Sequence, residues 1–444
     1  MFADISQLGV AVMMLIALAG LLIGGVWVGM SLMAAGFVAM QFVPGTNPGA
    51  VLSTQVWAAS ANWTLAALPL FIWMGEILFR TRMSEELFKG LSPWVNWLPG
   101  RLMHVNVIGC GIFGMVSGSS AATTATVAKI ALPELAKRGY NERLALGSLA
   151  GSGTLGLMIP PSITMIVYAF QAEVSLVKMF FAGFLPGLMV MALYSGYIIL
   201  WSLTHPDQQP PPEPKMSFRE KMAASANLLP TLLLVTFTFG ALFFGFATAT
   251  ECAAWGVTGA LAIAWWQGSL NWDTFKESLM GAMRLNGMIM LILAGAAFMS
   301  AAMGFTRIPA AIAEFVATMN LSPWTLILVL TIFYAVLGMF LDGISMIVLT
   351  IAIVKPLIDV PAFQALGLDL IWFGIFVVLV VEMAQVSPPV GFNLFVLQTM
   401  SGKDSWTVAR AALPFFLLLF LAVAIITVFP SIATFLPRLV FPLN

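Results

Sequence analysis

The stretch GMVSGSSAATTATVAKIALP, from Gly114 to Pro133, decides the fold of this chain. It continues an apolar run of helical length, Val105 to Phe113, and then breaks at SGSS, Ser117 to Ser120, where a helix would otherwise carry on. The glycine and the three hydroxyl groups free backbone carbonyls and add oxygen atoms of their own. In hydrocarbon, such irregular backbone persists only where it is buried in protein or lines a polar cavity.

The composition indicates that the chain lies in the hydrocarbon of a lipid bilayer. Of the 444 residues, 60% are apolar and 9% are charged, whereas a soluble domain has roughly 25% charged residues. The chain is therefore expected to be an integral membrane protein. Its formal net charge is zero, which gives no reason to expect a nucleic-acid partner. The first residues lack the basic region of a signal peptide, so the first apolar run is expected to stay in the mature protein.

Cysteine and histidine are too few to build a metal centre or a disulfide framework. Cys110 and Cys252 both lie in apolar runs, where a small packing role is expected. His104 and His205 are the only histidines, and no Cys/His cluster has the spacing of metal ligands. We therefore expect no cofactor.

Three further breaks complete the pattern, one in the same half of the chain and two in the other half. The second break is GTLGLMIPPS, Gly153 to Ser162. In the other half, the apolar run from Trp324 to Pro356 is interrupted at GMFLDGIS, Gly338 to Ser345, and the next run is interrupted at AQVSPPVG, Ala384 to Gly391. Interrupted helices at corresponding places in two halves indicate the binding site of a transporter.

The two halves can be laid over each other in order and in spacing. The matching pairs are Ser117-Gly118 with Asp342-Gly343, Ser120 with Ser345, and Pro160-Pro161 with Pro388-Pro389. The sequence thus predicts an all-α polytopic membrane protein built from two inverted-topology repeats, each with a re-entrant helical hairpin and a broken helix.

Polar composition and charge bias set the boundaries and the orientation. Residues 205–221 form the only long polar, proline-rich stretch, which predicts a cytoplasmic linker between a first repeat, 1–204, and a second repeat, 222–444. Basic residues crowd at 80–101, 129–143 and 215–221, so these segments are assigned to the cytoplasm. That assignment requires the first hairpin to enter from the cytoplasm and return, and the second then enters from outside. Both termini are predicted outside.

Four further elements are predicted from local pattern. Residues 83–97 mix charged residues with leucines and tryptophans, which is typical of an amphipathic helix lying in the interface. Residues 272–280 are predicted as a second interfacial segment, followed by a separate span at 285–304. A single last span is predicted at 413–436.

The hairpin tips carry the chemistry. Ser117 and Ser119 offer hydroxyl oxygens, and the break from Gly156 to Pro161 frees carbonyls because proline has no N–H to donate. Helix ends and unwound carbonyls favour ions, and a small hard cation such as sodium, which takes oxygen ligands, fits between them. Asp342 occupies the corresponding place in the second half. An unpaired charge in the membrane costs at least about 2.5–3.5 kcal/mol, so it requires a partner unless it lies at an interface.

Each feature also has a simpler interpretation. The small residues from Ser117 to Thr124 are typical of close helix packing as well as of a site. Glu173 and Glu382 are interpreted as structural or peripheral rather than coordinating. Lys129 and Lys355 are interpreted as snorkelling anchors at the membrane surface.

With these motifs in view, the chain resembles the large membrane subunit of TRAP transporters, the tripartite ATP-independent periplasmic family. The resemblance runs along essentially the whole chain and is strongest in five segments: SGSSAATTA (117–125), GTLGLMIPPS (153–162), SPPVGFNLF (387–395), PLFIWMGE (69–76) and FAGFLPG (181–187). It implies a sodium-coupled symporter of the bacterial inner membrane, not an enzyme, in which a transport domain moves as an elevator against a fixed scaffold.

The resemblance also implies partners. These are a small membrane subunit and a soluble periplasmic binding protein that delivers a small organic acid, such as a C4-dicarboxylate. Sodium ions serve as coupling ions.

Site residues follow by matching motif to motif. The first sodium site would comprise Ser117, Ser119, Gly156, Ile159 and Pro161. The second would comprise Gly343, Ser345, Ala384, Ser387 and Pro389, with Asp342 adjacent. The substrate would lie near Ser120, Thr123 and Asn393. Two departures from the family pattern affect the second site: Ser387 stands where threonine is usual, and Ala384 stands where glycine is frequent.

Two other functions compete with this interpretation. A stand-alone ion or proton antiporter of similar inverted-repeat fold would transport without a binding protein, but proton carriers place several carboxylates or histidines along the path, and few are present here. A membrane enzyme would need a clustered catalytic set, and the sequence contains no motif for one.

Overall fold

The computed structural model describes residues 7–81, 83–210, 216–319, 321–339, 341–388 and 391–441, and over these residues it contains helices and no strand. The helices up to the polar linker are α1 (Gln7–Ile23), α2 (Val28–Met40), α3 (Pro48–Ser60), η1 (Trp63–Ala66), α4 (Ala67–Phe79), α5 (Met83–Val95), α6 (Met103–Ser117), α7 (Ser120–Lys137), α8 (Glu142–Met158), α9 (Ile163–Ala172), α10 (Leu176–Thr204) and η2 (Pro206–Gln208). The expected all-helical fold is confirmed.

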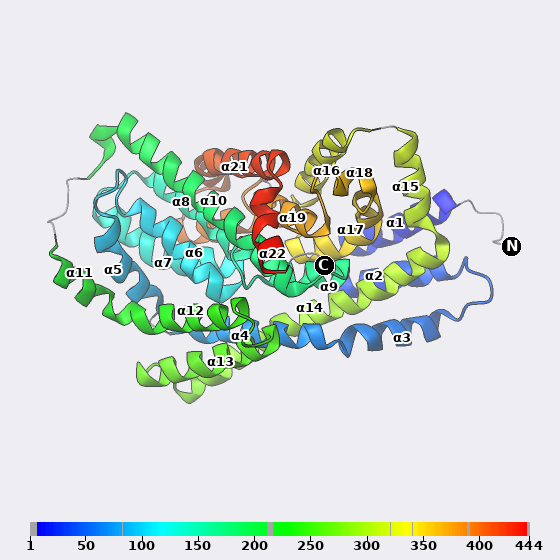
Figure 1. The fold of residues 1–444 in the computed structure, drawn as a ribbon, viewed down its shortest axis with the longest axis horizontal. Helices are drawn as coiled ribbons and strands as arrows, with labels where there is room; N and C mark the ends of the chain where they lie inside the picture. Colours follow the sequence, from blue (N-terminus) through cyan, green and yellow to red (C-terminus); the bar gives the residue numbers. More distant parts are fainter. Residues whose placement is uncertain are drawn as a thin grey trace.

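The rest of the chain supplies a similar series. It contains α11 (Phe218–Ser225), η3 (Ala226–Leu228), α12 (Leu229–Phe243), α13 (Ala249–Trp266), α14 (Trp272–Thr306), α15 (Ile308–Thr318), α16 (Pro323–Leu337), α17 (Gly343–Ile358), α18 (Pro361–Gln364), α19 (Leu370–Gln385), α20 (Phe392–Ser401), α21 (Ser405–Val428) and α22 (Ser431–Val440). The molecule is elongated, with α5, α7 and α11 toward one end and α1 and α15 toward the other (Figure 1).

Three helices in the described part of the chain are long and apolar enough to cross a membrane unaided, namely α10, α14 and α21. A fourth span forms if α8 and α9 are taken together, since they are separated by a short break and bent by 43°. Shorter apolar helices, α6, α16, α17 and α19 among them, pack around these spans. The chain is thus a multi-pass membrane protein with interrupted helices inside.

The first hairpin forms for local reasons. α6 ends at Gly118, whose φ of +58° is a left-handed conformation that glycine adopts without cost. Ser119 then caps α7, its hydroxyl accepting a hydrogen bond from the Ala122 N–H at 3.5 Å. The chain therefore reverses over two residues, and α6 and α7 pack side by side.

The second half repeats this order of elements. α16 ends at Leu337 and α17 begins at Gly343, while α19 ends at Gln385 and α20 begins at Phe392. Asp342 caps α17, while Tyr334 on α16 and Thr350 on α17 share a hydrogen bond of 2.8 Å. Hairpin, broken helix and long closing helix thus follow in the same sequence in both halves.

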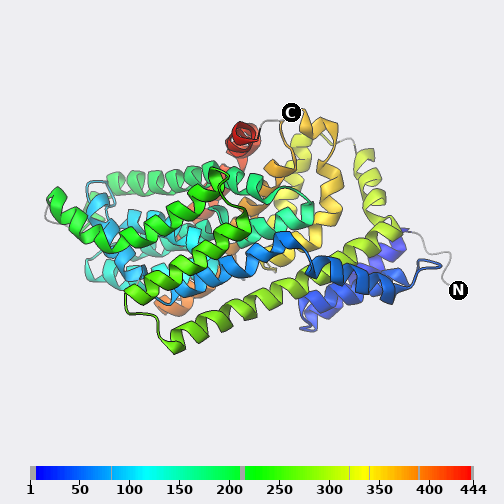
Figure 2. The same ribbon diagram turned by 60° about the horizontal axis from the view of Figure 1, so that its bottom comes forward.

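α14 is a single helix, so the prediction of an interfacial segment at 272–280 followed by a separate span was wrong. No proline interrupts residues 272–306, and Asn271 caps the start through a 2.7 Å bond from the Thr274 N–H. The helix runs along one side of the molecule beside α2, α3 and α4 (Figure 2). Arg80 at the end of α4 pairs with Glu277 on α14 at 2.7 Å and with Glu76 on its own helix at 3.2 Å.

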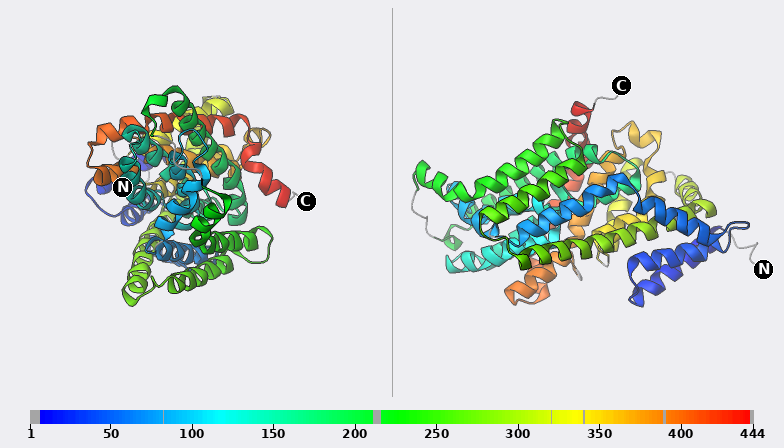
Figure 3. Two further views of the ribbon diagram at one scale, coloured as in Figure 1. Left: turned by 90° about the vertical axis from the view of Figure 1, so that its left-hand side faces the viewer. Right: turned by 90° about the horizontal axis from the view of Figure 1, so that it is seen from below.

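The single last span predicted at 413–436 was also wrong. α21 ends at Val428, and α22 begins at Ser431. Pro430 between them has no N–H to continue the helical hydrogen bonds. α22 folds back against α10 and α19, and its C-terminal end lies at the edge of the molecule (Figure 3).

Candidate cation and substrate site

The tip of the first hairpin rests directly on the break between α8 and α9. A methyl group at Gly156 would lie 2.7 Å from the Ser119 carbonyl oxygen and 2.6 Å from the Thr123 Oγ1. One at Gly114 would lie 2.8 Å from the Gly156 Cα, and one at Gly118 would lie 3.2 Å from the Pro161 carbonyl oxygen. The two interruptions therefore meet largely through backbone, with the Thr123 hydroxyl as the closest side-chain atom.

The proline pair beside this contact removes the helical donors of two carbonyl oxygens. In an α-helix the carbonyls of Gly156 and Leu157 would accept from residues 160 and 161, but both of these are proline and carry no N–H. The last intact bond of α8 runs from the Ile159 N–H to the Leu155 carbonyl at 3.0 Å. Leu157 was not among the predicted site residues, although its carbonyl is freed by the same proline pair.

Hydroxyl groups of the tip complete the oxygen cluster. Ser117 Oγ lies 2.6 Å from Thr123 Oγ1 and 3.3 Å from the Ser119 carbonyl oxygen. Each hydroxyl offers one donor and two lone pairs, so this set retains acceptor capacity for a cation. No group of three His, Cys, Asp or Glu converges in the described part of the chain, so a cation bound here would be held by main-chain and hydroxyl oxygens.

The structure thus brings together four of the five predicted first-site residues, Ser117, Ser119, Gly156 and Pro161. Ile159 differs, because its side chain packs away from the tip. Its Cγ1 faces Gly187 on α10, and its Cδ1 faces Gly111 on α6. Only the main chain of Ile159 is available to the cluster.

In the second half, Asp342 serves its own helix. Its Oδ2 accepts from the N–H groups of Ile344 and Ser345 at 3.1 and 3.2 Å, and its Oδ1 accepts from the Ser345 hydroxyl. The positive end of the helix dipole stabilises a carboxylate at this place. The partner that the sequence required for Asp342 is therefore the start of α17.

The other second-site residues are divided between two contacts. A methyl at Gly343 would meet Val381, and one at Gly338 would meet the Ala384 Cβ, so the second hairpin packs against the end of α19. Ser387 instead bonds back to α19, donating to the Met383 carbonyl at 2.8 Å. Pro389 lies outside the described residues.

The predicted substrate residues also separate. Ser120 donates a 2.8 Å hydrogen bond to the Asn393 Oδ1, and Asn393 in turn donates to the Ala150 carbonyl at 3.1 Å. All three are buried between α7, α8 and α20. Thr123 belongs with the first cation cluster through its contact with Ser117.

Glu382 on α19 was interpreted from the sequence as structural or peripheral, but its surroundings make it a candidate functional residue. Its side chain is fully buried, its Oε2 accepts from Thr154 on α8 at 3.3 Å, and its Oε1 has no hydrogen-bond partner among the described residues. The Tyr194 hydroxyl on α10 lies beside the same pair. The sequence signal for the burial of Glu382 is its position in an apolar run. Glu173, by contrast, is 81% exposed and pairs with Lys355 at 3.1 Å.

Comparisons with known proteins agree on one family. The family described as "Tripartite ATP-independent periplasmic transporter, DctM component" matches residues 15–432. The C4-dicarboxylate TRAP transporter large permease protein DctM of Pseudomonas aeruginosa is 31% identical over 87% of this chain and 89% of its own. The sialic acid large permease SiaM of Vibrio cholerae is 27% identical, covering 95% and 96%. The ectoine large permease TeaC of Halomonas elongata is 29% identical, covering 88% and 90%.

A solved structure shares the fold at low sequence identity. The Alcanivorax borkumensis YdaH transporter superimposes with a TM-score of 0.61 and 13% identity, covering 86% of this chain and 88% of that one. At this identity the likeness concerns the arrangement of helices alone.

Proposed function

Because the chain belongs to the DctM-component family of tripartite ATP-independent periplasmic transporters, we propose that it is the large permease subunit of a sodium-coupled importer of a small organic acid. The observation that carries the sodium proposal is the contact between the first hairpin tip and the α8–α9 break. In this contact the Thr123 hydroxyl, which is bonded to the Ser117 hydroxyl, lies against Gly156, the residue whose helical hydrogen-bond donor is replaced by Pro160.

Sodium suits this cluster better than a divalent or transition metal would. A hard monovalent cation takes neutral oxygen ligands, and the cluster offers carbonyls and hydroxyls without a carboxylate. The site depends on two separate chain segments meeting, so a bound cation would draw α7 and α8 together. We propose that this is how ion binding closes the hairpin.

The substrate proposal rests on the polar set beside that cluster. The Ser120–Asn393 pair joins α7 of the first half to α20 of the second, next to the tip. The relatives are named for C4-dicarboxylates, sialic acid and ectoine, compounds that all carry a carboxylate. Asn393 has a second amide N–H beyond the one that bonds Ala150, and an amide donor can hold a carboxylate, so a small carboxylic acid is the proposed cargo.

The remaining parts of the proposal follow the family. The subunit would work in the bacterial inner membrane with a small membrane subunit and a periplasmic binding protein. Its two hairpin-bearing halves, 1–204 and 222–444, would form inverted repeats, and the hairpins would move as one transport domain against helices such as α14. The second sodium site would lie where the Gly338–Asp342 connection packs on the end of α19.

Uptake into proteoliposomes tests the proposal. The chain is reconstituted with its two partners, and accumulation of a labelled organic acid is measured with an inward sodium gradient and with potassium in its place. One charge moving through 100 mV provides about 2.3 kcal/mol, so a sodium gradient with an inside-negative potential should drive accumulation.

The double variant Ser117→Ala with Ser119→Ala should abolish the sodium dependence. Ser53→Ala is the matched control, because that serine is exposed on α3 and bonds only within its own helix. Uptake that ignores sodium, or a double variant that matches the Ser53 control, would refute the proposed coupling.

A further inference from the structure

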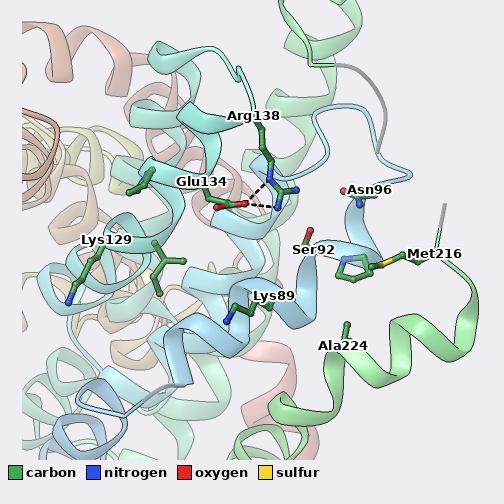
Figure 4. A pocket seen from close by; sticks show the side chains of 11 residues that line it. Lys89, Ser92, Asn96, Lys129, Glu134, Arg138, Met216 and Ala224 are labelled. Atoms are coloured by element: carbon green, nitrogen blue, oxygen red, sulfur yellow. Dashed lines mark hydrogen bonds and ion pairs between the residues drawn. The ribbon is translucent and has the colours of Figure 1, made fainter. Parts of the chain in front are cut away.

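A basic cavity lies at the end of the molecule remote from α15, where α5, α7 and the segment leading into α11 converge. Its volume is about 660 Å³. It is lined by Lys89, Ser92, Pro93 and Asn96 of α5 and its end, by Lys129, Ile130, Pro133, Glu134 and Arg138 of α7 and its end, and by Met216 and Ala224. Figure 4 shows the α5 side chains along one side and the α7 side chains along the other.

Positive charge dominates this cavity. Glu134 is already engaged by Arg138 at 2.6 Å, on the same helix. Lys89 and Lys129 are exposed, and neither has an ion-pair partner among the described residues. Among the described residues, the cavity therefore presents two ammonium groups without an ion-pair partner, one from α5 and one from α7. A phosphate group has the charge and the acceptor oxygens that ammonium groups bind.

The same cavity has an apolar part, which distinguishes a lipid from a soluble anion. Pro93, Ile130, Pro133 and Met216 provide carbon surface next to the lysines. A free phosphate ion gains nothing from carbon surface, whereas the glycerol and first methylenes of a lipid do.

The position of α5 agrees with a lipid. Trp97 just beyond α5 is 76% exposed, and Trp94 is partly exposed while donating to the Ser225 hydroxyl of α11 at 2.7 Å. Exposed tryptophans mark the headgroup level of a bilayer. Basic pockets between helices at the cytoplasmic surface bind anionic headgroups, and the charge bias assigns this end of the chain to the cytoplasm.

We propose that this cavity binds the phosphate headgroup of an anionic phospholipid, held between Lys89 of α5 and Lys129 of α7. Such a lipid links α5 to the second arm of the first hairpin. Binding does not depend on the proposed transport activity, whereas its effect on hairpin movement rests on that proposed function.

Lipid binding to the full-length chain in neutral detergent tests the site directly. Affinity for phosphatidylglycerol, for phosphatidylcholine and for inorganic phosphate is measured by native mass spectrometry and by the shift in melting temperature. Each lysine near a membrane surface changes affinity about fivefold, so Lys89→Gln with Lys129→Gln should weaken phosphatidylglycerol binding about thirtyfold. Phosphatidylcholine binding should be unchanged.

Lys276→Gln is the matched control, since Lys276 is exposed on α14 and does not line the cavity. Added salt should weaken phosphatidylglycerol binding to the unaltered chain, a measurement that needs no variant. Equal phosphatidylglycerol affinity in the double variant and the Lys276 control would overturn the proposal. Displacement of the lipid by inorganic phosphate at equal concentration would also overturn it, in favour of a soluble anion.

Discussion

Gly156→Ala is the substitution that most directly probes the contact between the first hairpin and the α8–α9 break. The new methyl would lie 2.7 Å from the Ser119 carbonyl oxygen, and ordinary contact begins at 3.4 Å, so the tip must retreat by about 0.7 Å. The Thr123 Oγ1, at 2.6 Å, is a second obstacle, and although that side chain can rotate, the Ser119 backbone cannot.

Two opposing effects set the change in stability. Overpacking of a close contact costs about 1–3 kcal/mol. Replacing a helical glycine by alanine stabilises the helix by up to about 1 kcal/mol. We therefore expect a net loss of roughly 0–3 kcal/mol in the free energy of unfolding, which leaves the chain folded. Sodium binding should suffer more, because ligand oxygens need placement to within about 0.5 Å. We expect sodium affinity to fall more than tenfold.

The assay is thermal unfolding of the purified chain in sodium and in potassium, with sodium titrated to obtain its affinity. Gly196→Ala on α10 is the control, because nothing lies within 4 Å of the added methyl. It should leave the sodium response unchanged and should not lower stability. If Gly156→Ala responds to sodium as the Gly196 variant does, the hairpin tip and the break do not form one ligand set, and the reasoning is refuted.

Three further outcomes are expected. Ser120→Ala leaves the buried Asn393 Oδ1 without its donor, so unfolding free energy should fall by about 1–3 kcal/mol and uptake should weaken; wild-type melting and uptake would contradict the α7–α20 link. Thr154→Val removes a donor to the buried carboxyl on α19 at nearly constant volume, and calorimetry should show a loss of similar size. Hydrogen bonds from Thr407 hold the pKa of Asp404 below its usual value. The stabilisation from these bonds is therefore present above about pH 4 and is lost as the pH falls through the lowered pKa. Asp404→Asn should remove this acid-side dependence from a profile of melting temperature against pH.

Features that depend on neighbouring residues were determined by the sequence itself. Proline at 160 and 161 removes two N–H donors wherever the helix lies, and Gly118 permits a left-handed turn that other residues resist. The hairpin of α6 and α7, the break after α8 and the apolar composition of the spans were therefore predictable. The continuity of α14 was less predictable, because the amphipathic pattern at 272–280 is the same whether or not the helix continues into the membrane.

Tertiary structure alone decided what each polar group faces. Asp342 occupies the place of Ser117 in the other half, yet its carboxylate caps α17, because a short acidic side chain reaches the free N–H groups of its own helix first. Ser120 meets Asn393 across 273 residues, and Thr154 meets Glu382 across 228, through contacts that no local pattern encodes. Local sequence spacing determines which oxygens lack a hydrogen-bond donor within their own helix. The packing of distant helices determines which of these oxygens share a site.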